Sequence, residues 1–399
     1  MLALDRIYHA AYVLKGVARK TDLIAAPHLV SGMGDLYLKT ENLQVTGSFK
    51  LRGASYKISQ LPKGDLERGI IACSAGNHAQ GVALAATHMG VRSIVCMPDG
   101  APIMKVESTR RLGAEVRLVK GSYDDAHDEA VRLQEKTGAT LIHPYDDEDV
   151  ICGQGTIGLE IMDQLEGVDA VVVPVVGGGL ISGVACAVKS LKPSCQVFGV
   201  QAAGASAMAE SFRRGDWYAS DTASTFADGI AVKNPGEITF QMVRKYVDDI
   251  VTVSDDEIAA AILNLMERQK VVAEGAGAVP VAAAMFDKLP LAGKRVVCVV
   301  SGGNIDVNIL SRVINRGLAM SGRKVTMEIR LTDKPGQLQQ VSTIIAELGA
   351  NVVSVDYDLS DPDLPISSCT LRVGMETRDQ AQIDQIRAKL VGEGFALVG

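Results

Sequence analysis

Between residues 69 and 305, short runs of apolar and mostly β-branched residues alternate with stretches long enough to form a helix. Continuous apolar runs of this kind are typical of strands that are buried on both faces between layers of helices. The alternation therefore predicts an α/β fold with a parallel or mostly parallel sheet. The runs are 70–72, 93–96, 116–119, 171–173, 197–200 and 296–300.

The pattern changes after residue 315. Residues 316–324 are small and basic, which indicates a linker. Apolar residues then alternate with polar ones from 325 to 331, as in a half-buried strand. The remaining pattern completes the order βαββαβ, which predicts a small ferredoxin-like domain over residues 325–399. Its further elements are a turn at 333–336, a helix over 341–348, strands at 352–357 and 369–373, a helix around 383–390 and a strand at 396–398.

Composition is that of an ordinary globular protein, because 47% of the 399 residues are hydrophobic and 22% are charged. This length predicts two or three domains. The net charge of -7 argues against binding to nucleic acid. Residues 170–188 carry no formal charge, yet Pro174 and the glycines at 177–179 would interrupt a membrane-spanning helix. We therefore expect a buried strand, a turn and a helix there, and no association with a membrane.

The seven cysteines are odd in number and widely spaced, and no two of them form a C-x-x-C pair. This pattern favours reduced, buried thiols over a disulfide framework or a zinc site. Residues 1–19 include four charged side chains, so they lack the uninterrupted apolar stretch of a signal peptide. A cytoplasmic location is therefore expected.

Three glycine-bearing loops follow predicted strands, at 74–78, 177–179 and 301–304. Ligands of parallel sheets bind at the carboxyl ends of strands, so the three loops are predicted to converge on one ligand. The loop at 177–179 opens a helix, whose N–H groups and dipole favour an anion. Ser182 stands where a dinucleotide fingerprint needs glycine, and no P-loop motif exists, so a single phosphate monoester is favoured. A glycine turn without a ligand remains the alternative.

Lys50 stands where the polar loop 46–49 enters a predicted helix. An amine fixed and partly desolvated at such a place can hold a cofactor, although most lysines are solvated surface residues. Ser74, Ala75 and Asn77 offer a hydroxyl, backbone N–H groups and an amide to a substrate carboxylate. His78 is a candidate base, but a packing role is favoured. Ser301 ends a buried strand, and its hydroxyl needs a partner such as a heteroaromatic ring nitrogen.

Five segments together resemble the fold-type II family of pyridoxal-phosphate enzymes, and within it the threonine dehydratases (threonine ammonia-lyases). They occur in the family's order, and the resemblance extends over about residues 19–315. It implies a catalytic domain over 1–315, built of two open twisted α/β subdomains, with the smaller at about 46–146 inserted in the larger. The region after the linker, with Asp333-Lys334-Pro335-Gly336, resembles an ACT domain. The five segments are 39–50, 74–78, 153–156, 227–229 and 301–304.

The resemblance also implies roles for individual residues. Lys50 would hold pyridoxal phosphate covalently, beside Phe49, and Asn77 would bond the 3′-oxygen of the cofactor. Gly177, Gly178 and Gly179 would hold the phosphate, and Ser301 would face the pyridine nitrogen. Ser74, Ala75 and Asn77 would bind the carboxylate of the substrate.

Two positions depart from relatives in the family. Val176 stands where the family usually has a fourth glycine, and a β-branched residue resists a positive φ there. The serine-racemase branch binds a divalent metal just after the strand at 197–200, where this chain has Gln201, Ala205 and Ala207. No metal is therefore expected. Glu274 is typical of the family, with a structural role and a site role equally open.

The implied activity is deamination of L-threonine to 2-oxobutanoate and ammonia, and of L-serine to pyruvate. The resemblance implies a homo-oligomer, a dimer or tetramer, regulated by isoleucine or valine near Gly336 and Asn351, where two ACT domains meet. A dimerisation module without a ligand is the alternative for this domain, and roles in isoleucine biosynthesis and in catabolism both stay open. Two rival functions stay open. One is another enzyme of the same cofactor family, such as a serine dehydratase, a racemase or a β-replacement synthase, and the other is a non-catalytic regulator.

Overall fold

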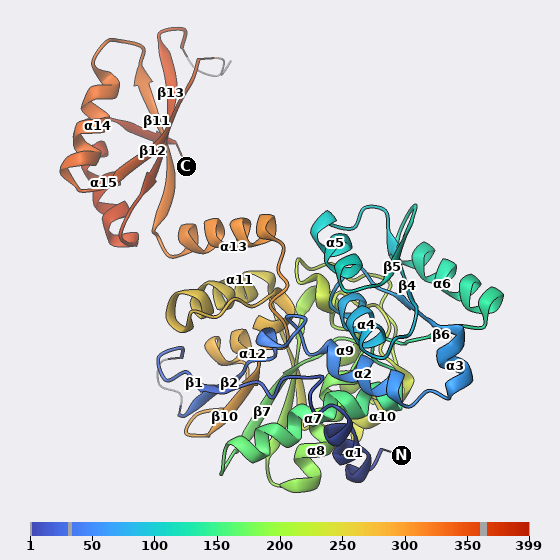
Figure 1. Cartoon of the computed structure of the whole chain (residues 1–399). Helices are drawn as coiled ribbons and strands as arrows, with labels where there is room; N and C mark the ends of the chain where they lie inside the picture. Colours follow the sequence, from blue (N-terminus) through green and yellow to red (C-terminus); the bar gives the residue numbers. More distant parts are fainter. Residues whose placement is uncertain (1, 31–33, 360–364, 399) are drawn as a thin grey trace. The chain divides into compact units, whose positions relative to one another are not determined.

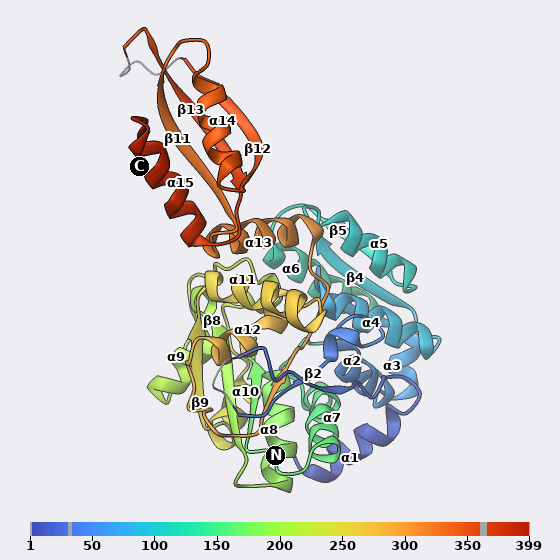
Figure 2. The ribbon, with the colours of Figure 1, turned by 90° about the vertical axis from the view of Figure 1, so that its left-hand side faces the viewer.

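The computed structural model describes residues 2–30, 34–359 and 365–398 and consists of two compact units, Met1–Val307 and Asn308–Gly399 (Figure 1). The larger unit contains two sheets, and the smaller unit contains one. The sheets of the larger unit are covered by helices, as a view turned by 90° also shows (Figure 2). The predicted α/β class is confirmed for this unit, and each unit is described below by itself.

The main sheet of the larger unit has six strands in the order β1-β2-β10-β7-β8-β9. All neighbouring strands are parallel except β1, which pairs antiparallel with β2. Every residue of β7 and β10 is buried, which is why both strands were visible as apolar runs in the sequence. The strands are β1 (Leu23–Ala25), β2 (Leu36–Lys39), β7 (Ala170–Pro174), β8 (Gln196–Ala202), β9 (Asp249–Val253) and β10 (Val296–Val299).

Helices pack on both faces of this sheet. Val171 and Val173 share a core cluster with residues of α8 (Gly179–Leu191). Cys298 points to the other face, where its Sγ lies 3.6 Å from a carbonyl oxygen of α12 (Gly275–Met285). Further helices complete the two layers: α1 (Leu4–Val13), α7 (Glu148–Gln164), α9 (Ala207–Arg214), α10 (Glu237–Tyr246) and α11 (Asp255–Asn264).

The second sheet of the larger unit has four parallel strands in the order β5-β4-β3-β6. Alternate residues of β3 and β4 pack against α4 on one face and α6 on the other. Three of the four strands match predicted runs, whereas β6 has only two residues and was not predicted. The elements are β3 (Ile70–Cys73), β4 (Ser93–Pro98), β5 (Glu115–Val119), β6 (Thr140–Leu141), α2 (Lys50–Ser59), α3 (Lys63–Arg68), α4 (Asn77–His88), α5 (Ile103–Arg111) and α6 (Tyr123–Thr137).

The charge-free stretch folds as expected, into β7, a glycine turn and the beginning of α8. Over the described ranges, no helix is long and apolar enough to cross a bilayer. All seven cysteines are buried and carry free thiols.

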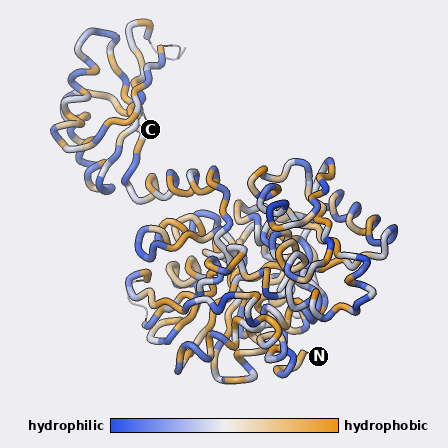
Figure 3. The backbone as a smooth tube through the Cα atoms, in the orientation of Figure 1, coloured by the Kyte–Doolittle hydropathy of each residue, from blue (hydrophilic) through white to orange (hydrophobic). Residues whose placement is uncertain are grey.

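The smaller unit begins with α13 (Val307–Met320), and this differs from the sequence-based prediction. A linker was expected over 316–324, but the helix continues through 316–320, and the division between the units falls after its first residue, Val307. Arg316, Leu318 and Ala319 favour a helix, and the single glycine between them does not end it. Hydrophilic and hydrophobic residues alternate along α13 as blue and orange segments (Figure 3).

The rest of the smaller unit follows the predicted βαββαβ order. Its antiparallel sheet has the strand order β12-β13-β11-β14, and α14 and α15 share one hydrophobic cluster with it. Alternate residues of β11 enter this cluster, which is the period of two expected for a sheet with one covered face. The elements are β11 (Lys324–Thr332), α14 (Gln337–Glu347), β12 (Asn351–Asp358), β13 (Ser368–Glu376), α15 (Gln380–Gly392) and β14 (Ala396–Val398).

Candidate active site

Lys50 is the first residue of α2, and Phe49 precedes it as the N-cap. The lysine Nζ donates a hydrogen bond of 2.8 Å to the carbonyl oxygen of Pro144 and lies 5.1 Å from the centre of the Phe49 ring. Burial lowers the pKa of the amine to about 8, against the opposing effect of the Glu274 carboxylate. A substantial neutral fraction near physiological pH is what a nucleophilic lysine requires.

The third glycine loop lies directly beside the segment that carries Lys50. The N–H of Phe49 donates to the carbonyl oxygen of Ser301 at 3.1 Å, and the N–H of Gly303 donates to Gly47 at 2.9 Å. Ser48 and Gly302 form an isolated antiparallel bridge between these two bonds. Ser301 is buried, so its hydroxyl stands within the same enclosed region.

The first glycine loop reaches this region through Asn77, the first residue of α4. The Nδ2 of Asn77 donates to Oε1 of Glu274 at 2.6 Å, and its Oδ1 accepts from Nδ2 of Asn304 at 2.8 Å. Ser74 lies three residues before Asn77, and its Oγ accepts from the N–H of Gly76 at 3.1 Å. Two of the three predicted loops, with Lys50, therefore meet as the sequence indicated.

The loop at 177–179 joins β7 to α8. Its Gly177 carbonyl accepts hydrogen bonds from the Thr239 hydroxyl at 2.5 Å and from the N–H of Gly236 at 3.1 Å. The loop depends on glycine, because Gly178 has a φ of 102° and a Cβ on Gly177 would lie 2.2 Å from the Tyr145 ring. The first N–H groups of α8 have no partner within the helix and carry its positive dipole end, which suits a phosphate.

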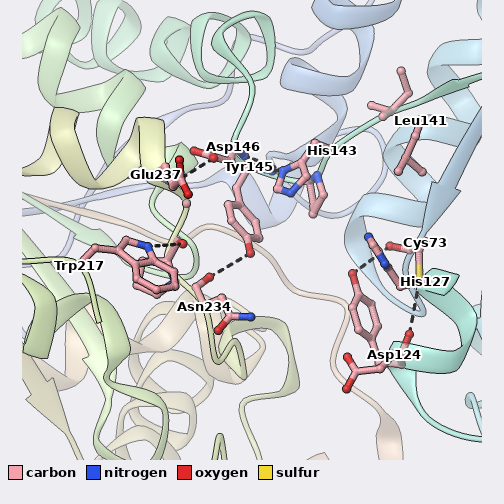
Figure 4. Close-up of a pocket in the computed structure, with 15 residues that line it drawn as sticks. Cys73, Asp124, His127, Leu141, His143, Tyr145, Asp146, Trp217, Asn234 and Glu237 are labelled. Atoms are coloured by element: carbon pink, nitrogen blue, oxygen red, sulfur yellow. Dashed lines mark hydrogen bonds between the residues drawn. The ribbon is translucent and has the colours of Figure 1, made fainter. Parts of the chain in front are cut away.

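Residues 144–146 connect this loop to Lys50. They line a cavity of about 410 Å³, with residues in and beside the four-stranded sheet of the larger unit on one side and Trp217 and residues 234–237 on the other (Figure 4). Pro144 bonds Lys50, while the neighbouring Tyr145 covers Gly177 and donates its hydroxyl to the Asn234 carbonyl at 3.0 Å. Sequence reasoning missed this segment, although it follows the end of β6, where ligand loops of parallel sheets are found.

His78 has a structural position. Its Nε2 lies 2.9 Å from the carbonyl oxygen of Ile142, and the side chain is buried. Burial, followed by the charge of Lys50, lowers the pKa of its imidazole to about 3. A group that is neutral over the physiological range and bonded to a carbonyl supports the packing interpretation favoured from the sequence.

Val176 does not meet the strain that its β-branched side chain suggested. Among the described residues, only Lys270 and Asp287 have a positive φ without being glycine. The positive φ of this loop falls on Gly178 instead. Nearby, at the end of β8, both ends of the Gln201 amide are engaged, with the Val176 carbonyl and with the N–H of Ala209.

The helix of Lys50 is anchored by buried charges that sequence reasoning did not single out. Arg52 is 2% exposed and donates to Glu41 at 2.8 Å and to Glu160 at 2.6 Å. Lys39, fully buried, donates to Glu160 at 2.6 Å. Although burial opposes it, the Arg52 charge holds the pKa of Glu41 below its usual value.

The predicted effector residues of the smaller unit lie apart. Gly336 precedes α14, just beyond the Thr332 end of β11. Asn351 begins β12 and pairs with Glu376, which pairs with Lys324 at the other end of β11. A strand of nine residues spans roughly 27 Å, so one copy of the chain cannot bring both residues to one amino acid.

Comparison with known proteins identifies the larger unit. A family model described as pyridoxal-phosphate dependent enzyme matches residues 14–302. The chain belongs to this family. Pyridoxal phosphate is therefore its cofactor, and the residues present fit it. Lys50 supplies a desolvated amine, the glycine loop supplies bare N–H groups for a phosphate, and Ser301 supplies a buried hydroxyl.

Individual members of the pyridoxal-phosphate family resemble the chain closely. An L-threonine ammonia-lyase of Thermotoga maritima is 51% identical over 397 residues, which cover 99% of this chain and 98% of the relative. A solved structure of the processed form of threonine deaminase isoform 2 from Solanum lycopersicum has 37% identity and a TM-score of 0.73, covering 78% of this chain and 93% of that one. Maize serine racemase has 34% identity and a TM-score of 0.75, covering 80% and 98%.

Proposed function

We propose that the chain is a threonine ammonia-lyase, which deaminates L-threonine to 2-oxobutanoate and ammonia. The observation that carries this proposal is the desolvated Lys50 amine at the meeting point of two glycine loops, in a chain 51% identical to an L-threonine ammonia-lyase. The enzyme is a carbon–nitrogen lyase of the cytoplasm.

The site residues divide the chemistry among them. When bound, the cofactor supplies the electron sink that makes a Cα proton removable. Lys50, beside Phe49, would hold the cofactor, and its neutral amine would take the Cα proton. Gly177, Gly178 and Gly179 would hold the phosphate, Asn77 would bond the 3′-oxygen, and Ser301 would face the ring nitrogen.

The substrate carboxylate binds to Ser74, Ala75 and Asn77 at the amino end of α4. L-serine, which lacks one methyl group, is also deaminated, because a pocket distinguishes a methylene by only about 1–3 kcal/mol. The similarity to maize serine racemase supports access of serine to a site of this shape.

The smaller unit acts as an ACT-type sensor of isoleucine or valine. Its βαββαβ order supports this assignment, and the separation of Gly336 from Asn351 supports a binding site that combines them from two copies. In this proposal the enzyme is a homo-oligomer, a dimer or tetramer, and roles in isoleucine biosynthesis and in catabolism both stay open. A dimerisation module without an effector is the alternative.

The test begins with the absorbance spectrum of the purified protein, followed by addition of L-threonine and an assay for 2-oxobutanoate. The expected result is an absorbance band near the edge of the visible range that changes when threonine is added, together with formation of 2-oxobutanoate. Lys50→Ala should lose both, while Lys63→Ala, at an exposed lysine of α3, should keep both. A colourless, inactive protein after addition of pyridoxal phosphate would favour the regulator. A protein that shows the band and leaves L-threonine unchanged, but forms D-serine or pyruvate from added L-serine, would favour a racemase or serine dehydratase.

A further inference from the structure

The side-chain amide of Asn77 is held from two sides. Its Nδ2 donates to the Glu274 carboxylate at 2.6 Å, and its Oδ1 accepts from Nδ2 of Asn304 at 2.8 Å. Asn304 is itself fixed, because its Nδ2 also donates to the carbonyl oxygen of Thr46 at 2.8 Å. The three side chains come from α4, the N-cap of α12 and the loop after β10.

These partners permit only one orientation of the Asn77 amide. A flipped amide would set its oxygen against the oxygen of Glu274 and its NH₂ group against the NH₂ group of Asn304. In the observed orientation, one N–H of Asn77 is used by Glu274 and the second remains available to a further acceptor.

The backbone leaves room for this arrangement at two glycines. A Cβ on Gly302 would lie 2.2 Å from Oε1 of Glu274 and 3.2 Å from Nδ2 of Asn77. A Cβ on Gly47 would lie 2.4 Å from Oδ1 of Asn304. The segments around Lys50 and Ser301 are therefore shaped to admit the side chains that hold Asn77.

We propose that Glu274 and Asn304 are positioning residues, which fix Asn77 so that its second N–H faces an anionic oxygen of the bound cofactor. This inference rests on the proposed role of Asn77 in the active site. It assigns Glu274, whose role the sequence left open, to the support of the site rather than to the edge of the sheet.

The Glu274 carboxylate has an electrostatic effect in addition. The charged or titratable groups that face it are Lys50 on α2, Asp228 after β8 and Lys105 on α5, and Lys105 is paired with Asp228. Burial, followed by repulsion from Asp228, raises the pKa of Glu274 to about 7. Since Glu274 also raises the pKa of Lys50 against burial, removal of its charge should shift the titration of Lys50 to lower pH.

The experiment is a titration of the apoenzyme with pyridoxal phosphate, followed by the absorbance band of the lysine-bound cofactor at several pH values. Glu274→Ala and Asn304→Ala should each weaken cofactor binding about tenfold or more. Glu274→Ala removes the charged acceptor of the Asn77 N–H, and Asn304→Ala removes the donor that holds the Asn77 Oδ1. Glu274→Gln keeps an acceptor, so its affinity should fall less than that of Glu274→Ala, while the midpoint of band formation moves to lower pH.

Glu67→Gln, at an exposed glutamate of α3, is the matched control and should behave as wild type. The proposal would be overturned if the Glu274 variants kept both the wild-type affinity for the cofactor and the wild-type midpoint of band formation. If Glu274→Ala does not fold, unchanged affinity in Asn304→Ala would overturn it. Wild type and Lys50→Ala are measured in the same series. A wild type without the band would instead overturn the proposed site itself, so the two failures are distinguishable.

Discussion

Lys50 and Pro144 are joined by a hydrogen bond of 2.8 Å, which the lysine amine donates to the main-chain oxygen of the proline. The bond fixes the amine next to the segment that covers the glycine loop 177–179, so the proposed nucleophile and the proposed phosphate site border the same segment. The acceptor is neutral, and within the described part of the chain Glu274 is the one carboxylate that raises the pKa of the amine. Burial can therefore lower the pKa of Lys50 to about 8.

The first prediction concerns the pH dependence of cofactor attachment. Only a neutral amine attacks the cofactor, so the rate at which the absorbance band forms in the apoenzyme should rise with pH and level off above about 8. Stopped-flow mixing between pH 6 and about 10 measures this rate. An amine with the ordinary value of 10.5 would instead give a rate that still rises tenfold per pH unit near pH 9.

The second prediction concerns the glycine loop. Val176→Gly should change cofactor affinity by less than about threefold, because Val176 has no positive φ to relieve. Gly178→Ala, two residues later, should weaken binding strongly, since Gly178 has a φ of 102° and an added Cβ would lie 2.7 Å from Met208. Equilibrium titration of both apoenzymes gives the comparison, and a large gain in Val176→Gly would show that the valine does restrict the cradle.

The third prediction concerns the buried ion pairs behind Lys50. Arg52→Met leaves the buried Glu41 carboxylate without its ion-pair partner and Glu160 with Lys39 alone, which should cost about 3–5 kcal/mol in the free energy of unfolding. The control is Arg92→Met, which breaks an exposed pair with Glu115 and should cost no more than about 1 kcal/mol. Urea denaturation of both variants measures the two losses in the free energy of unfolding. Equal losses would mean that the buried network does not stabilise the fold.

The fourth prediction concerns stability and pH in the apoenzyme. Glu274 has a pKa of about 7 in the folded state against an ordinary 4.5, so the folded protein binds more protons between these values. Its contribution to the free energy of unfolding is thus present at low pH and is lost as pH rises toward about 7. The stability of Glu274→Gln relative to wild type should therefore rise by up to about 3 kcal/mol from pH 4.5 to pH 8. Glu67→Gln should show a constant difference, and the same constancy in Glu274→Gln would contradict the assignment.

The fifth prediction concerns the smaller unit. Gly336→Val and Asn351→Ala should each abolish the response to isoleucine or valine, because each removes one half of a site formed by two copies. When the two variants are unfolded and refolded together, mixed dimers contain one site with both native residues. The response to the effector should reappear in that mixture, as measured by 2-oxobutanoate formation. Its absence, with wild type responding, would place the two residues in different sites.

Much of the fold could be predicted from the sequence because its strands are buried between helices. The runs at 70–72, 171–173 and 296–300 became β3, β7 and β10, since a strand enclosed on both faces is apolar throughout. The short β2 was missed, because it ends in Lys39, whose charge is paired with Glu160 of α7 only in the folded chain. The helical state of 316–320 was not predicted, because local composition does not show that a helix continues through Gly317.

The sequence by itself determined the local chemistry: a lysine at a helix start, glycine loops after strands, and the family to which these motifs belong. Those features depend on residues adjacent in the chain, whose backbone conformation is set locally. Only the tertiary structure decided the partners. Asn77 and Glu274 are separated by 197 residues, and Pro144 reaches Lys50 from 94 residues away. Such contacts, and the pKa values that burial produces, exist only after the two sheets of the larger unit have formed.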